Sequence, residues 1–260
     1  MITSIHSSRI KWVRALLNNK KERTNSKCFV VEGVRLAEEV LQAGFMPQLV
    51  LFSKRLSKRG VQIIDSLQLS NAAIEEISSE LLNRVSDTET SQGILMVLHY
   101  VNLVFPRKID FILVLDNIHD PGNLGTILRS ATAFGVQAVL LTPGTSDIFA
   151  PKIVRSAMGA HFHLPIKIAS AEIIQKICKG QSSLLRIYLA NAQAGIPCWK
   201  LDLTQPLALV IGGEAHGVSQ ELSMMADKNV LIPMPGGTES INAAISAGIL
   251  SYEVMRQRKS

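Results

Sequence analysis

The sequence predicts an α/β protein of two domains, a small N-terminal domain and a larger C-terminal domain built on a mostly parallel sheet. The first hundred residues alternate short apolar segments with stretches of helical spacing. Residues 100–110 then contain Pro106, followed by two charged side chains, and form the candidate linker. Beyond residue 110 the apolar segments are longer and nearly continuous, as expected of parallel strands buried on both faces. We therefore expect domains at residues 1–105 and 106–260.

The N-terminal domain is expected to be a small α/β unit. Helical spacing places Trp12, Leu16 and Leu17 on one side of a first helix. Gly44 is expected to end a second helix, because glycine commonly follows the last helical residue. The expected elements are helices over residues 8–17, 34–44 and 61–67 and strands over 29–31, 48–52, 73–77 and 92–99.

The C-terminal domain is expected to contain a parallel sheet with helices between its strands. The apolar runs that predict strands cover residues 111–115, 138–141, 185–190, 207–211 and 230–232. A last helix is expected over residues 242–257, and its first turns are rich in small side chains. Small residues there would allow another backbone to approach closely.

Composition excludes several classes of protein. No run approaches the roughly 18 apolar residues of a membrane span. Arg9, Lys11 and Arg14 interrupt the N-terminus before a signal-peptide core can form, so we expect a cytoplasmic protein. The three cysteines are scattered at Cys28, Cys178 and Cys198. Such an odd set predicts reduced thiols rather than disulfides or a zinc site, and no segment has the spacing of metal ligands.

Positive charge is concentrated at the N-terminus. Residues 1–59 hold 12 Lys and Arg against four Glu, whereas the remaining residues hold 15 basic against 17 acidic side chains. This asymmetry is typical of a module that binds a polyanion. The alternative is that residues 20–23 and 54–59 are simply solvated turns.

Three polar segments rich in Gly and Asn interrupt the apolar C-terminal half. They cover residues 117–131, 211–217 and 232–243, and each falls just beyond the end of an expected strand. Ligands bind at this edge of open parallel sheets. The Gly-Gly-x-x-x-Gly spacing of the second segment argues against a Rossmann dehydrogenase. From local patterns alone, Asn123 and Ser240 are expected to cap helices.

In order and spacing, these segments resemble the three motifs of the SpoU (TrmH-like) family of the SPOUT class. Members are RNA ribose 2′-O-methyltransferases that use S-adenosylmethionine. The resemblance implies a knotted C-terminal methyltransferase domain and homodimers formed through it. The N-terminal domain resembles the ribosomal-protein-like substrate-binding domain of many members. One departure is Ser240-Ile-Asn-Ala-Ala244, where the family usually has Ser-Leu-Asn-Val-Ser.

The resemblance also assigns roles to individual residues. The catalytic set that it implies is Asn123, Arg129, Glu214, Ser240 and Asn242. The cofactor-binding set is Asn191, Gly212, Gly213, Ile232, Met234 and Ile241. Glu214 is expected to hold Arg129 or a nearby backbone group. His119 and His216 are expected to be loop residues because they match no catalytic position of the family. In the family the arginine is the proposed general base, but a guanidinium effectively never loses its proton. A bidentate clamp on a phosphate of the RNA is the alternative role.

The attached N-terminal domain favours ribosomal RNA of the 23S type as substrate. Family members that modify the tRNA D-loop generally lack this domain, whereas several 23S rRNA enzymes have it. Two alternatives stay open, a tRNA 2′-O-methyltransferase and an RNA-binding or assembly protein that no longer catalyses. The intact catalytic set argues against the second alternative.

Overall fold

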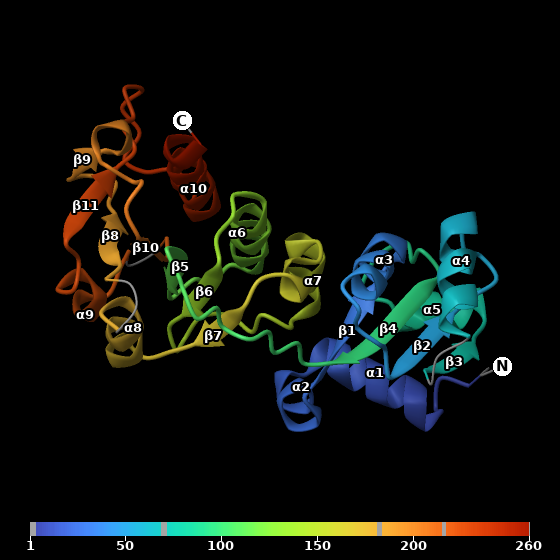
Figure 1. Cartoon of the computed structure of the whole chain (residues 1–260). Coiled ribbons are helices and arrows are strands. Elements are labelled where there is room, and N and C mark those ends of the chain that lie inside the picture. Colours follow the sequence, from blue (N-terminus) through green and yellow to red (C-terminus); the bar gives the residue numbers. More distant parts are fainter. Residues whose placement is uncertain (1–3, 69–71, 181–183, 215–216, 260) are drawn as a thin grey trace. The chain divides into compact units, whose positions relative to one another are not determined.

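In the computed structural model, which describes residues 4–68, 72–180, 184–214 and 217–259, the chain forms two compact units (Figure 1). The first unit comprises Met1–Val101 and Asp147–Phe162, and the second comprises Asn102–Ser146 and His163–Ser260. The sequence assigned residues 147–162 to the C-terminal domain. This stretch, called the 147–162 segment below, instead packs in the first unit.

The first unit is built on a mixed four-stranded sheet in the order β1-β4-β2-β3. The pairs β1–β4 and β2–β4 are antiparallel, and β2–β3 is parallel. Its elements are α1 (Ser8–Asn18), α2 (Lys20–Ser26), β1 (Cys28–Glu32), α3 (Val34–Gln42), β2 (Leu49–Phe52), α4 (Lys58–Leu67), β3 (Ala73–Glu76), α5 (Ser79–Val85) and β4 (Ile94–His99), with α7 (Pro151–Ala157) and the short 3-10 helix η1 (Ala160–Phe162) from the 147–162 segment. Every helix and strand expected before residue 100 is present, and α2 and α5 are additional.

Alternation along the strands gives this sheet two buried faces. Val30, Leu49 and Leu51 pack with apolar side chains of α1 and α5. Phe29 and Val50 face the other way, toward α3, α4 and the 147–162 segment. A five-residue strand such as β1 is therefore buried along its whole length.

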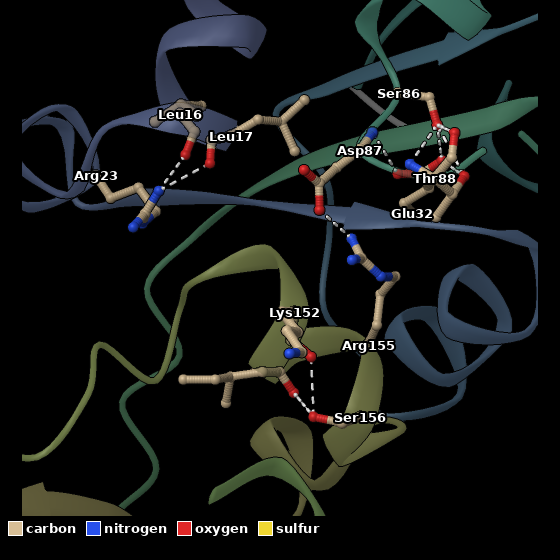
Figure 2. Close-up of polar contacts among 11 residues, drawn as sticks. Leu16, Leu17, Arg23, Glu32, Ser86, Asp87, Thr88, Lys152, Arg155 and Ser156 are labelled. Atoms are coloured by element: carbon tan, nitrogen blue, oxygen red, sulfur yellow. Dashed lines mark hydrogen bonds and ion pairs between the residues drawn. The ribbon is translucent and has the colours of Figure 1, made fainter. Parts of the chain in front are cut away.

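The 147–162 segment completes the core of the first unit. Phe149, Val154 and Phe162 belong to the same apolar cluster as Phe29, and the Phe149 and Phe29 ring centroids are 4.8 Å apart. Figure 2 shows a polar contact of the same segment, in which Arg155 of α7 pairs with Asp87 at 2.6 Å. Removing the segment would take three apolar side chains out of this core and expose residues that they cover, such as Phe29.

Arg23 is buried and joins α2 to the same segment. Its guanidinium donates to the Leu16 carbonyl at 2.6 Å and pairs with Asp147 at 2.8 Å (Figure 2 shows the Leu16 contact). Because the Arg23 side chain is only 6% exposed, its charge stabilises the fold through Asp147 and is not presented to solvent. Of the basic run at residues 20–23, only Lys20 and Lys21 are exposed cations.

The second unit is built on a seven-stranded sheet in the order β7-β6-β5-β10-β8-β11-β9, in which every neighbouring pair is parallel. Its elements are β5 (Phe111–Asp116), α6 (Pro121–Ala133), β6 (Ala138–Leu141), β7 (Ile166–Ile168), α8 (Ala171–Cys178), β8 (Arg186–Ala190), β9 (Ile196–Pro197), the short 3-10 helix η2 (Cys198–Lys200), β10 (Leu207–Gly212), α9 (Gln220–Ser223), β11 (Lys228–Leu231) and α10 (Ala243–Lys259). The expected mostly parallel sheet is confirmed, while the knot stays a prediction.

Helices cover both faces of the central strands. Ile112 and Val114 of β5 pack in one cluster with Ile174 of α8 and Leu222 of α9. The alternate side chains, including Leu113, are equally buried, on the face where α10 contacts β10 and α6. No helix in the described part of the chain is long and apolar enough to cross a membrane.

The three cysteines are free and buried. Burial raises the pKa of each thiol, and that of Cys178 to about 12. A thiol with a raised pKa is a poor nucleophile, so these side chains are packing residues, as the sequence predicts.

Candidate functional site

A cavity of about 690 Å³ lies where parallel strands β8 and β10 end, beside the chain that follows β11. This volume is within the range of small-molecule sites. All six residues expected to contact the cofactor line it, namely Asn191, Gly212, Gly213, Ile232, Met234 and Ile241. Glu214, Ser240 and Asn242 of the expected catalytic set line it too, whereas Asn123 and Arg129 do not.

The cavity wall after β10 is a tight glycine turn. The Gly217 N–H donates to the Gly213 carbonyl at 2.9 Å, and Gly217 has a φ of +64°, which favours glycine. A Cβ placed on Gly212 would lie 2.3 Å from the Gly217 carbonyl carbon, and one on Gly213 would lie 2.4 Å from the Asn117 carbonyl oxygen. Gly212 and Gly213 are required because other backbone segments pass too close to leave room for a side chain.

Asn123, Glu214 and Asn242 form one hydrogen-bonded cluster, although they come from three distant parts of the sequence. The Asn123 side-chain amide donates to Glu214 Oε1 at 2.5 Å. Asn242 Nδ2 donates both to Asn123 Oδ1 at 2.9 Å and to Glu214 Oε1 at 3.1 Å. The three polar segments therefore meet at one point beside the cavity.

Two expected helix caps are wrong. Asp120, not Asn123, caps α6, because its carboxylate accepts the Asn123 backbone N–H at 2.7 Å. Asn242, not Ser240, caps the N-terminus of α10, because its Oδ1 accepts the Ala244 N–H at 2.9 Å. The side-chain amide of Asn123 is consequently available for Glu214, and that of Asn242 serves both the helix and the cluster.

Arg129 lies on α6 and is exposed. Its guanidinium makes no hydrogen bond or ion pair with any residue that the structure describes. Of the two kinds of partner expected for Glu214, Arg129 is not one in this structure, since the carboxylate accepts from the Asn123 and Asn242 side chains. His119 lies in an exposed loop, as expected, and His216 is outside the described residues.

Sequence reasoning missed Asp116, the last residue of β5. Its side chain is buried at 1% exposure, and its oxygens accept from Ser219 N, Thr142 Oγ1 and Asn117 Nδ2. The available signal was a carboxylate at the end of the apolar run 111–115, immediately before the first polar segment.

Acidic side chains give the cavity a negative character. Glu214 and Glu239 both line it, and no Lys or Arg is among its lining residues. In the described part of the chain, no group of three His, Cys, Asp or Glu side chains is placed to hold a metal ion. The cavity suits an organic ligand with positive charge.

A second, shallow apolar groove of about 450 Å³ lies between α6 and α10. Ile245 and Tyr252 contribute to it and are 55% and 48% exposed. The small residues Ser130 and Gly248 also line this groove. Exposed side chains of this kind are typical of a surface that another protein covers.

Comparison with known proteins identifies relatives along the whole chain. The profile of the SpoU rRNA Methylase family matches residues 110–252, and that of the MRM3-like substrate binding domain matches residues 7–96. The chain is 34% identical over 256 residues to the 23S rRNA (guanosine(2553)-2′-O)-methyltransferase RlmP of Bacillus subtilis (strain 168), covering 97% of this chain and 98% of that protein. It is 31% identical over 272 residues to the 23S rRNA (uridine(2479)-2′-O)-methyltransferase of Streptomyces viridochromogenes, covering 100% and 93%.

A solved structure has the same fold. The SpoU methyltransferase AviRb from Streptomyces viridochromogenes, in complex with the cofactor AdoMet, superposes with a TM-score of 0.86 at 28% identity, covering 97% of this chain and 99% of that one. The family profile alone spans more than half of the 260 residues, and it includes all three polar segments. The chain belongs to the SpoU rRNA methylase family.

Proposed function

We propose that this protein transfers a methyl group from S-adenosylmethionine to a ribose 2′-hydroxyl of 23S-type ribosomal RNA. The observation that carries the proposal is the Asn123–Glu214–Asn242 cluster, which joins the three family motifs beside the cavity. Glu214 and Asn242 line the cavity and Asn123 is hydrogen-bonded to both, so the cluster lies at the edge of the sheet where ligands bind in this type of fold.

The cavity fits the cofactor. When bound, S-adenosylmethionine supplies an electrophilic methyl group on a positively charged sulfonium. The carboxylates of Glu214 and Glu239 match that charge, and Ile211, Val230 and Leu250 offer apolar surface for a base. We assign cofactor contacts to the six lining residues that the sequence motifs imply.

We assign the catalytic roles as follows. Asn123 and Asn242 hold one oxygen of Glu214, so the other oxygen remains able to accept a hydrogen bond from a ligand hydroxyl or amine. Ser240 lines the same cavity as Glu214 and Asn242 and offers a hydroxyl to a bound ligand. Arg129 clamps a phosphate of the RNA, and a phosphate oxygen or water takes the proton of the 2′-hydroxyl.

The N-terminal domain supports ribosomal RNA over tRNA as the substrate. Its profile match is to a substrate-binding domain, and the relatives described above that span nearly the whole chain are named as 23S rRNA enzymes. We propose that the first unit reads the RNA and that the second unit carries out methyl transfer. A ribosomal substrate also supports a cytoplasmic location, which cell fractionation tests.

The experiment that tests the function compares RNA from cells with and without the gene. A single ribose methyl mark on 23S rRNA should disappear with the gene and return with the wild-type gene. Purified protein should then methylate the same nucleotide in an rRNA fragment. Loss of a tRNA mark alone would favour the tRNA alternative. Normal cofactor binding with no lost mark in any RNA would favour the assembly protein.

Exposed cations of the first unit are expected to bind RNA phosphates. Lys20 and Lys21 lie in α2, while Arg55 and Lys58 lie before and at the start of α4. Replacing either pair with alanine should raise the KM for RNA and leave kcat at saturating RNA unchanged. The slope of log affinity against log salt should flatten by about 0.9 for each lost duplex contact, or about 0.7 for a single strand.

A matched control for these variants removes Lys176 and Lys179 from α8 and its end in the second unit, where two charges are also lost from the surface. Filter binding at several salt concentrations measures the slopes. Equal flattening in the control and the two test variants would contradict the assignment of RNA reading to the first unit.

We further propose a homodimer formed through the groove between α6 and α10. The exposed Ile245 and Tyr252, and the small residues Ser130 and Gly248 between them, support it, because a second copy would cover this apolar surface. Sedimentation equilibrium tests the proposal, and a single-chain mass at micromolar concentration would contradict it.

A further inference from the structure

Asp116 holds both ends of the turn that carries Glu214. Its backbone carbonyl accepts the Gly213 N–H at 2.9 Å, and its Oδ2 accepts the Ser219 N–H at 2.7 Å. Glu214 and Gly217, which line the cavity, lie between these two anchor points. One residue therefore fixes where the turn leaves β10 and where it enters α9.

The second carboxylate oxygen of Asp116 fixes the chain that leads to Asn123. Oδ1 accepts from Thr142 Oγ1 at 2.7 Å and from Asn117 Nδ2 at 3.0 Å. Thr142 Oγ1 in turn accepts the Asn117 backbone N–H at 3.1 Å. Asn117 has a φ of +53°, in the left-handed region that asparagine adopts more readily than most residues, and its hydrogen bonds to Asp116 and Thr142 hold it there.

These contacts link Asp116 both to the segment that carries Asn123 and to the turn that carries Glu214. Asn123 lies seven residues after Asp116 in the sequence, and Glu214 follows directly after the anchored Gly213. The Asn123–Glu214 hydrogen bond of 2.5 Å therefore depends on two backbone paths that meet at one buried carboxylate. Neither path has another buried charge among the residues described.

A carboxylate suits this position, because all three side-chain and backbone partners donate to it. An amide in the same place has one acceptor oxygen and a group that can only donate. If the amide oxygen of Asp116→Asn faces Thr142 and Asn117, the Ser219 N–H loses its acceptor. If the oxygen faces Ser219 instead, the Thr142 hydroxyl and the Asn117 amide must both reorient, which releases the chain that leads to Asn123.

We propose that Asp116 is a positioning residue for methyl transfer, which touches neither RNA nor cofactor and acts by setting Glu214 against Asn123. The inference rests on the proposed function of this site. It predicts a loss of turnover beyond any loss of folded protein, because a misplaced catalytic group costs rate even in a folded enzyme.

The test measures kcat, the KM for an rRNA fragment, the dissociation constant for S-adenosylmethionine and the melting temperature of Asp116→Asn. We expect kcat to fall on the order of 10- to 100-fold at a temperature where the variant is fully folded. The KM for RNA should stay within about twofold, because Asp116 does not reach the RNA-binding unit. Asp227→Asn is the matched control, since that carboxylate also accepts a backbone N–H at 2.7 Å, from Ile187, but at the opposite end of β8.

A double variant separates positioning from general stability. In a Glu214→Gln background, Asp116→Asn should lower kcat by less than about threefold more, because the two residues act on the same step. Additive losses, or a normal kcat in folded Asp116→Asn, would overturn the inference. If Asp116→Asn does not fold, Ser219→Pro removes the N–H that Asp116 accepts, because Ser219 has a φ of −59°, which proline can adopt, and its side chain makes no capping hydrogen bond.

If the wild-type protein binds S-adenosylmethionine but methylates no RNA, the proposed function is contradicted. The role of Asp116 is then tested by the affinity for S-adenosylmethionine. Asp116→Asn should weaken the affinity about tenfold, because the anchored turn forms a wall of the cavity. An unchanged dissociation constant in that case would overturn it.

Discussion

Arg129→Ala is expected to lower kcat on the order of 100- to 1000-fold, the usual loss when a group that stabilises developing charge is removed. The dissociation constant for S-adenosylmethionine should stay within about twofold, because Arg129 is not among the residues that line the cavity. The melting temperature should also be unchanged, since Arg129 is exposed and has no polar partner among the residues described.

The reason for the expected loss is the planar fork of the guanidinium. Arginine can bind two oxygens of one phosphate, which fixes the orientation of the attached ribose. Arg129→Lys keeps the charge but loses the fork, so it should recover only a small part of kcat. If Arg129 merely attracts RNA, lysine should restore activity almost fully.

Arg186→Ala is the matched control, because Arg186 is an exposed arginine of the same unit at the start of β8. Single-turnover methylation of an rRNA fragment, together with calorimetry for the cofactor, measures both effects. Turnover of Arg129→Ala above about a tenth of the wild-type value would contradict the role assigned to Arg129.

Strands in the interior of the large sheet could be predicted, whereas those at its edges could not. The six residues of β5 are all buried, and a continuous apolar run is the sequence signal of such a strand. In contrast, β7 and β9 have three and two residues, lie at the two edges, and are mostly exposed. Their pairing depends on neighbouring strands, so their own sequences contain too little signal.

Short polar helices were missed for a similar reason. α2 has seven residues, of which only Arg23 is buried, so it shows no apolar periodicity. Its Asn19 cap, like the Ser78 cap of α5, was a local signal that the sequence did contain. The position of the 147–162 segment had no local signal, because Phe149 and Asp147 find their partners more than 100 residues away in sequence.

The motifs did not indicate which atoms bind each other in the Asn123–Glu214–Asn242 cluster, or that Arg129 lies outside it. Asp120 and Asn123 are both good helix caps, and only the hydrogen bond from Asn123 N to Asp120 shows which one serves. The same ambiguity applies to Ser240 and Asn242. Asp116 was missed because a single carboxylate after a strand gives no indication of its partners, which lie 26 and 103 residues away.

Gly212→Val is expected to weaken S-adenosylmethionine binding by 10- to 100-fold or more, on the order of 1–3 kcal/mol for overpacking at a closely packed site. From the sequence, the reason would be a side chain placed against the ligand. The structure adds a more direct one, since the new Cβ would lie 2.3 Å from the Gly217 carbonyl carbon and 2.5 Å from the Val218 nitrogen. These are backbone atoms, so the turn that forms the cavity wall must open.

Gly236→Ala provides the control, because Gly236 also belongs to a glycine pair of the motifs but has no atom within 4 Å of an added Cβ. It should bind the cofactor with wild-type affinity. Calorimetry and thermal melts on both variants separate loss of the site from loss of the fold, since Gly212 lies at the end of β10 and the sheet hydrogen bonds before it can persist. A folded Gly212→Val protein with normal affinity would show that the backbone around Gly212 and Gly217 is not part of the cofactor site.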